Sequence, residues 1–242
     1  MGSRSTAKTL NKRIHELQRW IGAGLDLLFP IQCAGCGEAD TIWCDVCDAS
    51  LVRLVEPLCP LCGYPLGKQR SCPSCRSKRP ELPVRSFARY SGRVTQALLH
   101  LKYHPDRQLA AVMGAWLGEL YGREGWGAEV IVPVPLSKQR AQKRGFNQAA
   151  LLADALSSRI DLPVDKRSLR RVEDTRSQVG LDPHERWENV EHVFEVGSQS
   201  LADMDVLIVD DLFTTGATMS ACAVAIRASG ARSVSGITVA RA

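Results

Sequence analysis

The chain has 242 residues, of which 45% are hydrophobic and 24% charged, with a formal net charge of +5. These values are typical of a globular protein with room for one α/β domain and a small additional module. No run of about 18 apolar residues occurs, which argues against a transmembrane segment. Nine cysteines without a recognisable secretory signal favour metal binding over disulfides, and we therefore expect a cytoplasmic location.

Residues 1–30 are expected to form an N-terminal amphipathic helix after a loose polar start. Apolar side chains recur every three or four positions, and Pro30 ends the pattern. The repeating positions are Leu10, Ile14, Leu17, Ile21, Leu25 and Leu28. We expect this face to pack on the body of the protein, and contact with a membrane surface or a partner helix is the alternative.

Residues 31–80 are expected to form a double zinc ribbon, because eight cysteines occur there as four Cys-x2-Cys pairs. Two such pairs supply the four thiolates of a tetrahedral zinc site. Sequential pairing closes the shortest loops and groups Cys33, Cys36, Cys44 and Cys47 in one site and Cys59, Cys62, Cys72 and Cys75 in the other. Crossed pairing and redox-active dithiols are the alternatives. No ligand position is left open, so both zinc ions are expected to be structural.

Basic residues surround the second group of cysteines, with Trp43 and Tyr64 nearby in the sequence. They are Lys68, Arg70, Arg76, Lys78 and Arg79. Basic groups combined with aromatic rings can hold single-stranded nucleic acid, and a solvated basic surface is the alternative. Eight thiolates and two Zn²⁺ would lower the net charge by four, to about +1. A strongly basic overall field is therefore excluded as an argument for nucleic acid binding, and only local patches remain.

Residues 81–242 are expected to form an α/β domain after a proline-containing linker. Strands are predicted over residues 85–90, 129–135 and 206–211, within 162–169, and over 233–239. Helices are predicted over residues 94–103, 109–121, 151–160 and 219–229. Alternating strands and helices predict a doubly wound parallel sheet, in which ligands bind beyond the carboxyl ends of the strands.

The sequence VLIVDDLFTTGAT at residues 206–218 combines a buried strand, two carboxylates, a Thr/Gly loop and the start of a helix. Asp210 and Asp211 suit sugar hydroxyls or a hydrated Mg²⁺. A helix N-terminus attracts phosphate, and Gly216 lets the backbone approach it closely. We therefore predict a ribose 5-phosphate ligand whose phosphate is held by Thr214, Thr215, Gly216, Ala217 and Thr218. An ordinary strand–turn–helix with a capping threonine is the alternative.

Two further segments are candidates for the same site. Ser137, Lys138 and Arg140 follow the strand at 129–135 and suit pyrophosphate, with a solvated basic turn as the alternative. The long polar stretch 170–194 is expected to be a mobile lid, with a plain surface excursion as the alternative. Lys102 is an additional candidate for contacting phosphate.

The stretch 206–218 resembles the phosphoribosyl pyrophosphate (PRPP) motif of type I phosphoribosyltransferases. Further motifs occur in order: LLFP at 27–30 before the first cysteine pair, LKY at 101–103, VPVPL at 132–136 and RGFNQ at 144–148. Together they are similar to the ComF family, the group of ComFC- and GntX-like proteins, over residues 17–242. The resemblance implies a double zinc ribbon, a type I phosphoribosyltransferase-like domain over residues 81–242 and a bacterial cytoplasmic setting.

The resemblance also implies ligands and partners. These are PRPP with Mg²⁺, imported single-stranded DNA, and competence or helicase-type proteins. Asp210 and Asp211 would be the catalytic acids, and the flexible loop would contribute Thr175, Gln178, Arg186 and Asn189. Few residues follow the last predicted strand, so any hood over a nucleobase is expected to come from the N-terminal half.

Three hypotheses follow from these patterns. The first is a PRPP-binding, phosphoribosyltransferase-like protein that takes part in DNA uptake or in the use of imported DNA and binds single strands. The second is an active phosphoribosyltransferase of nucleobase or nucleotide metabolism without a role in DNA uptake. The third is a redox switch, which predicts reversible disulfides in place of metal.

Overall fold

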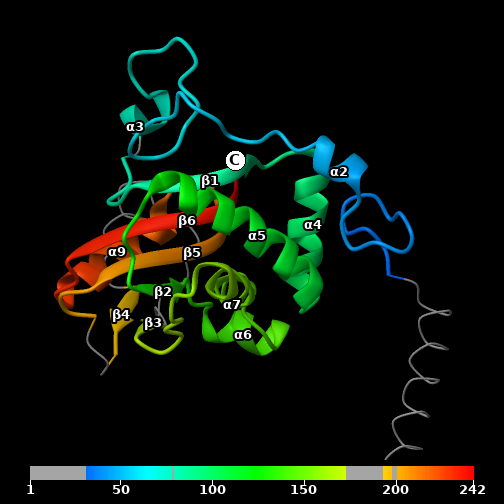
Figure 1. Ribbon diagram of the computed structural model, residues 1–242. Coiled ribbons are helices and arrows are strands. Elements are labelled where there is room, and N and C mark those ends of the chain that lie inside the picture. The colour runs from blue at the N-terminus through cyan, green and yellow to red at the C-terminus, as the bar shows by residue number, and fades with distance from the viewer. Residues whose placement is uncertain (1–30, 78, 173–192, 198–200) are drawn as a thin grey trace, which may run out of the picture.

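The computed structural model describes residues 31–77, 79–172, 193–197 and 201–242 (Figure 1). The N-terminal helix expected over residues 1–30 and the lid residues Thr175, Gln178, Arg186 and Asn189 lie outside the described residues. Across the described stretches, no helix combines the length and apolar character needed to cross a membrane.

A four-stranded parallel sheet forms the centre of the larger domain (Figure 1). Its strand order is β1-β6-β5-β2, with β1 Val84–Arg89, β2 Val130–Pro133, β5 Asp205–Phe213 and β6 Ser233–Arg241. The strand expected within residues 162–169 is reduced to a single parallel bridge between Ile131 and Val164, beyond the outer edge of β2. The predicted parallel α/β architecture is confirmed.

Both faces of the sheet are covered. Along β5, Val206 and Ile208 pack into one apolar cluster, whereas Leu207 and Val209 pack into another. One face is covered by α4 Gly92–Tyr103, α5 Arg107–Glu124 and α7 Gln148–Ile160, and the other by α9 Ala217–Ala228 with the antiparallel pair β3 Leu169–Arg171 and β4 Phe194–Val196. Burial on both sides explains why residues 206–209 of β5 are apolar at successive positions.

The structure corrects the sequence prediction for two helices. The basic segment after β2, for which no helix was predicted, contains the short helix α6 Lys138–Arg144. Ser137 caps this helix by accepting a hydrogen bond from the Arg140 N–H at 3.3 Å, and Gly145 ends it with φ 74°. The last helix, α9, begins at Ala217, two residues earlier than expected, because Gly216 adopts φ 80° directly before it.

The two cysteine-rich segments lie along the β1 edge of the sheet. The first contains α2 Asp45–Ala49 beside α4, and the second contains α3 Pro73–Ser77 (Figure 1). The chain between them pairs with β1: the Leu54 N–H donates to Phe87 O at 2.9 Å, and the Arg89 N–H donates to Val52 O at 2.8 Å. The connecting segment therefore covers an edge strand that would otherwise expose unpaired backbone groups.

Candidate functional site

The eight paired cysteines form two separate clusters, one from Cys33, Cys36, Cys44 and Cys47 and the other from Cys59, Cys62, Cys72 and Cys75. The ligand atoms of each cluster lie within 4.8 Å of one another. The Sγ–Sγ distances are 3.6 Å for Cys33–Cys47, 3.6 Å for Cys36–Cys44, 3.7 Å for Cys59–Cys75 and 3.5 Å for Cys62–Cys72. A sulfur tetrahedron with Zn–S bonds of about 2.3 Å has edges of about 3.8 Å. The geometry fits two Zn²⁺ ions and confirms sequential pairing.

Backbone N–H groups in both clusters favour thiolates. Burial opposes ionisation of Cys33, but the N–H group of Cys44 at 3.4 Å and the N–H groups of Gly35 and Cys36 outweigh burial and lower the pKa of this thiol to about 6. The pKa of Cys59 is lowered to about 7 by N–H groups of Cys62 and Leu61, again against burial. Burial and neighbouring thiols raise the pKa of Cys47 and Cys75. A full set of four thiolates therefore requires a cation, which Zn²⁺ supplies.

The loop at residues 214–218, here called the phosphate loop, connects β5 to α9. Gly216 is the N-cap of α9 with φ 80°, and a Cβ added there would lie 2.9 Å from the Phe213 ring. Gly216 has no side chain to cap α9, the Thr215 Oγ1 accepts a long hydrogen bond of 3.4 Å from the Ala217 N–H, and the hydroxyl-bearing residues Thr214, Thr215 and Thr218 are exposed. The first turn of α9 thus presents backbone N–H groups to solvent in the way that anion sites at helix N-termini do.

The two acids lie at the end of β5, next to this loop. The Asp211 carboxylate is buried, and its Oδ2 lies 3.8 Å from the Lys102 Nζ at the end of α4. This oxygen has no hydrogen-bond partner among the described residues. Asp210 accepts a hydrogen bond from the Asp211 N–H at 2.9 Å, and burial together with the adjacent Asp211 carboxylate raises its pKa. An unsatisfied buried carboxylate oxygen is costly unless a ligand hydroxyl or a cation meets it.

Arg171 joins the site from β3, although the sequence prediction had placed it in the lid. Burial, and then the nearby charge of Arg140 on α6, lower the pKa of its guanidinium. Its charge acts on the Cys222 thiol of α9, whose pKa is raised by burial and by the Asp210 charge. Arg140, Arg171 and Asp210 therefore share one electrostatic environment, built from α6, β3 and β5. In the sequence, the only local indication that Arg171 belongs to the site is its place at the end of a short strand.

The segment that carries Ser137, Lys138 and Arg140 is held beside β5. The Val134 N–H donates to Val209 O at 2.9 Å, and Asn147 Nδ2 donates to Val134 O at 3.0 Å. The end of β2 is thereby fixed next to the strand that carries both acids. The hydroxyl of Ser137 is engaged as the cap of α6.

The second zinc ribbon packs directly behind the phosphate loop. Arg241, at the end of β6, donates to Cys62 O at 2.5 Å and to Ser74 Oγ at 2.9 Å. Its guanidinium lies 5.2 Å from the centre of the Tyr64 ring and 5.0 Å from the centre of the Phe213 ring. Phe213 is the residue that contacts Gly216. The sequence prediction did not identify Arg241.

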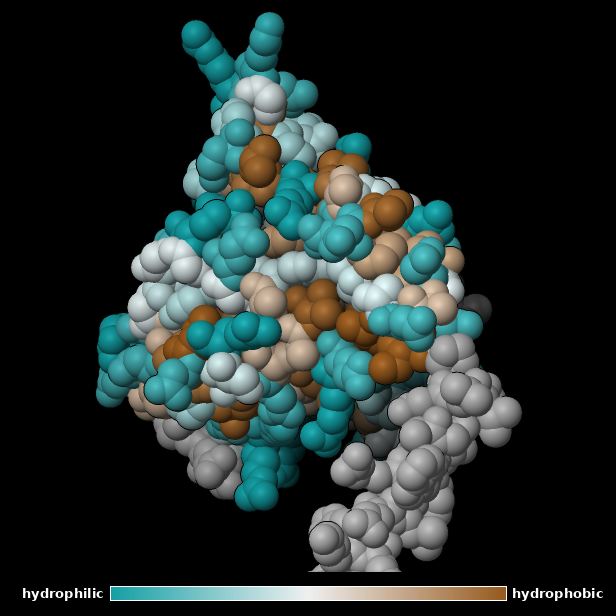
Figure 2. Space-filling model, turned by 45° about the vertical axis from the view of Figure 1, so that its right-hand side comes forward, coloured by the Kyte–Doolittle hydropathy of each residue, from teal (hydrophilic) through white to brown (hydrophobic). Residues whose placement is uncertain are grey.

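The tip of the second ribbon is hydrophilic. Figure 2 shows this end of the molecule as a projection from which long polar side chains extend. Among the described residues of this ribbon, Lys68, Arg70, Arg76 and Arg79 are basic and exposed, and Lys78 lies outside the described residues.

Comparisons with known proteins agree with these two modules. The double zinc ribbon domain family matches residues 24–76, and the phosphoribosyl transferase domain family matches residues 142–242. The chain is 28% identical to the competence protein ComFC of Bacillus subtilis (strain 168), with 91% of this chain and 98% of that protein covered. It is 31% identical to the DNA utilization protein YhgH of Salmonella typhi, with 79% and 86% covered. A purine phosphoribosyltransferase structure from Pyrococcus horikoshii is similar with a TM-score of 0.35 and 18% identity, covering 54% of this chain and 81% of that one.

Proposed function

Because the chain belongs to the family of the competence protein ComFC and the DNA utilization protein YhgH, we propose that it binds PRPP with Mg²⁺ and handles single-stranded DNA during DNA uptake or use. The observation that supports PRPP binding most directly is the unsatisfied carboxylate oxygen of Asp211 beside the N-terminus of α9, where the N-cap residue is a glycine without a side chain. Acceptors for hydroxyls and donors for phosphate lie next to each other there.

The order of chemical groups in PRPP matches the order of side chains in this site. The phosphate loop would hold the 5′-phosphate, while Asp210 and Asp211 would accept from the ribose hydroxyls. Arg140 and Arg171 would face the pyrophosphate with Ser137 and Lys138. Burial and then the mutual repulsion of the two guanidinium groups lower the pKa of Arg171, and this repulsion supports an anionic ligand at that position.

Mg²⁺ suits this site because carboxylate and phosphate oxygens are its preferred ligands. When bound, it supplies charge that neutralises the pyrophosphate. The lid residues Thr175, Gln178, Arg186 and Asn189 belong to the proposal as groups that would close over the ligand.

Calorimetry of zinc-loaded protein with PRPP and Mg²⁺ tests this proposal. We expect saturable binding that Asp210→Asn combined with Asp211→Asn abolishes. Asp154→Asn is the matched control. Asp154 lies on α7, is half-exposed, and its Oδ1 is 2.6 Å from the Lys166 Nζ. Absence of heat in the unaltered protein would refute PRPP binding.

The proposed contact with DNA is supported by the basic tip of the second ribbon. Lysine and arginine side chains bind strand phosphates with the release of counterions, so affinity should fall steeply with salt. We expect an oligodeoxynucleotide to bind in the cytoplasmic salt range and Lys68→Ala with Arg70→Ala to reduce the salt slope by about 1.4. A slope unchanged by these substitutions would remove the tip from the interface. Competence or helicase-type proteins are the partners that this role requires.

A further inference from the structure

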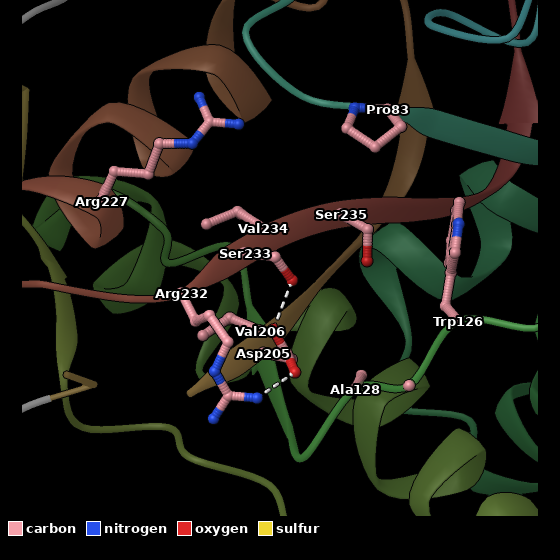
Figure 3. Close-up of a pocket in the computed structure, with 11 residues that line it drawn as sticks. Pro83, Trp126, Ala128, Asp205, Val206, Arg227, Arg232, Ser233, Val234 and Ser235 are labelled. Carbon is pink, nitrogen blue, oxygen red and sulfur yellow. Dashed lines mark hydrogen bonds and ion pairs between the residues drawn. The ribbon is translucent and has the colours of Figure 1, made fainter. Parts of the chain in front are cut away.

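A cavity of about 430 Å³ lies at the amino ends of the sheet strands, whereas the phosphate loop lies at their carboxyl ends (Figure 3). It opens at the amino ends of β5 and β6, where Asp205 and Ser233 are the first strand residues. The phosphate loop follows the carboxyl end of β5. Because these strands are parallel, the two sites are separated by the length of the sheet, and the cavity is not part of the proposed PRPP site.

The walls of the cavity come from both sides of the sheet. Figure 3 shows Arg227 on α9 at one side, Trp126 from the loop after α5 at the other, and Ser233 and Ser235 of β6 between them. Pro83 lies above β6. The cavity therefore offers an aromatic ring and a guanidinium group at opposite ends, with hydroxyl groups in the middle.

One of the two arginines in the cavity is already neutralised. Arg232 Nη1 lies 2.6 Å from Asp205 Oδ2, and Arg232 Nη2 lies 3.3 Å from Glu129 Oε2. The Ser233 hydroxyl donates to the other Asp205 oxygen at 2.7 Å. The Asp205 carboxylate is thus occupied by two partners that hold it in place, which limits its repulsion of an anion.

The Arg227 guanidinium is the positively charged group of the cavity that has no ion-pair partner in the described chain. Arg227 lies in the last turn of α9 and is exposed, and its side chain makes no ion pair or hydrogen bond among the described residues. The Ser235 hydroxyl and the Trp126 indole N–H likewise have no partner within the described parts of the chain. These are the groups that remain for a ligand.

We propose that this cavity binds one nucleotide unit, with the base against Trp126, the phosphate at Arg227 and Ser235 bonded to the sugar or base. Stacking on an aromatic ring is the general means by which proteins hold an unpaired base, and arginine matches phosphate geometry. The volume lies in the range of small-molecule sites. Free phosphate would not use the Trp126 ring, and an apolar ring would not use the Arg227 guanidinium. The inference stands on the cavity and does not rest on PRPP binding.

Nuclear magnetic resonance of the Trp126 indole N–H provides a local test. The chain has five tryptophans, so Trp126→Phe identifies the signal. Titration of the full zinc-loaded chain with dAMP should shift this signal saturably, and Arg227→Ala should weaken the apparent affinity by about tenfold. Arg107→Ala is the matched control, an exposed helical arginine at the opposite end of α5 from Trp126. Deoxyadenosine and inorganic phosphate should each bind about tenfold more weakly than dAMP.

A second variant separates this site from the phosphate loop. In Gly216→Val the phosphate loop is blocked, and the dAMP shift at Trp126 should persist with unchanged affinity. Loss of the shift there would assign it to the phosphate loop and overturn the proposal, as would an unmoved Trp126 signal or an Arg227→Ala variant that binds normally. Zinc content verifies that the ribbons of each variant are folded, and far-ultraviolet circular dichroism verifies the α/β domain.

The source of the nucleotide is decided by a short oligodeoxynucleotide. If the strand shifts the Trp126 signal at lower concentration than dAMP does, the cavity receives a unit of single-stranded DNA. If dAMP shifts it and the strand does not, the cavity receives a free nucleotide. Both results support the site, and failure of both ligands refutes it.

Discussion

The two zinc ribbons have the same metal chemistry but pack against different parts of the molecule. In the first ribbon, the Trp43 ring meets the Trp116 ring of α5 edge to face with centroids 5.2 Å apart, and Arg93 of α4 donates to Gly35 O at 3.2 Å. The first ribbon is therefore packed on helices. In the second ribbon, Cys62 O and Ser74 Oγ accept from Arg241, which also lies against Phe213 behind the phosphate loop.

This difference assigns the ribbons different structural roles. Small metal ribbons obtain much of their folding free energy from the metal, so loss of zinc should unfold either one. Unfolding of the first ribbon would expose Trp116, which packs in the apolar cluster on the face of the sheet opposite α9. Unfolding of the second would release Arg241 and Phe213, and with them the support of Gly216. The second ribbon therefore supports the phosphate loop of the candidate site through Arg241 and Phe213.

Removal of zinc from one ribbon at a time should have the largest effect. We expect Cys72→Ser with Cys75→Ser to lower PRPP affinity by more than about 100-fold, because displacement of a binding loop by an ångström has such consequences. Cys36→Ser with Cys44→Ser should leave PRPP affinity near that of the unaltered protein. Zinc content and calorimetry check both variants. Equal losses of affinity would abolish the distinction between the ribbons.

Substitution of Arg241 should have the next largest effect, because it removes one link while zinc stays bound. We expect Arg241→Ala to lower PRPP affinity by about tenfold and to cost about 1–3 kcal/mol of stability, since Cys62 O loses a buried charged donor. Arg85 still holds the ribbon by donating to Pro60 O at 3.0 Å, so zinc content should not change. Arg93→Ala, the equivalent contact in the first ribbon, should not alter PRPP affinity in the same calorimetric titration.

Gly216→Ala tests the last of the contacts that connect Arg241 through Phe213 to the phosphate loop. The new Cβ would lie 2.9 Å from the Phe213 ring, at φ 80°. We expect a loss of about 1–2 kcal/mol in the free energy of unfolding, measured by denaturant titration, and weaker PRPP binding. Gly122→Ala is the control, because nothing lies within 4 Å of its Cβ position in α5. That variant should gain up to about 1 kcal/mol from helix propensity.

Asp210→Asn should have the smallest effect, and that effect should be a gain in the stability of the ligand-free protein. The pKa of Asp210 is raised by burial and by Asp211, so the folded state binds its proton more tightly than the unfolded state does. Stability is therefore lost as pH rises from the unfolded pKa through the folded one, and an amide escapes this loss. We expect the variant without ligand to gain a few degrees in Tm near neutral pH, with the gain disappearing in acid. A gain independent of pH would contradict this assignment.

Local chemistry made part of the fold and site predictable. Cys-x2-Cys spacing, the strand leading into Asp210 and the glycine before α9 each depend on neighbours only a few residues away. The helix α6 was missed although Ser137 and Gly145 bound it, because seven residues are too few to establish a periodicity. Arg171 was assigned to the lid because its strand has only three residues.

The sequence by itself determined the metal ligands, the acidic strand end and the parallel α/β architecture, since these follow from spacing and periodicity. Tertiary structure alone decided which ribbon supports the phosphate loop and which residues line the second cavity. Cys62 and Arg241 are 179 positions apart, and Trp126 and Arg227 come from elements on different faces of the sheet. No local pattern encodes such contacts, because they arise only when the sheet has assembled and both faces have been covered.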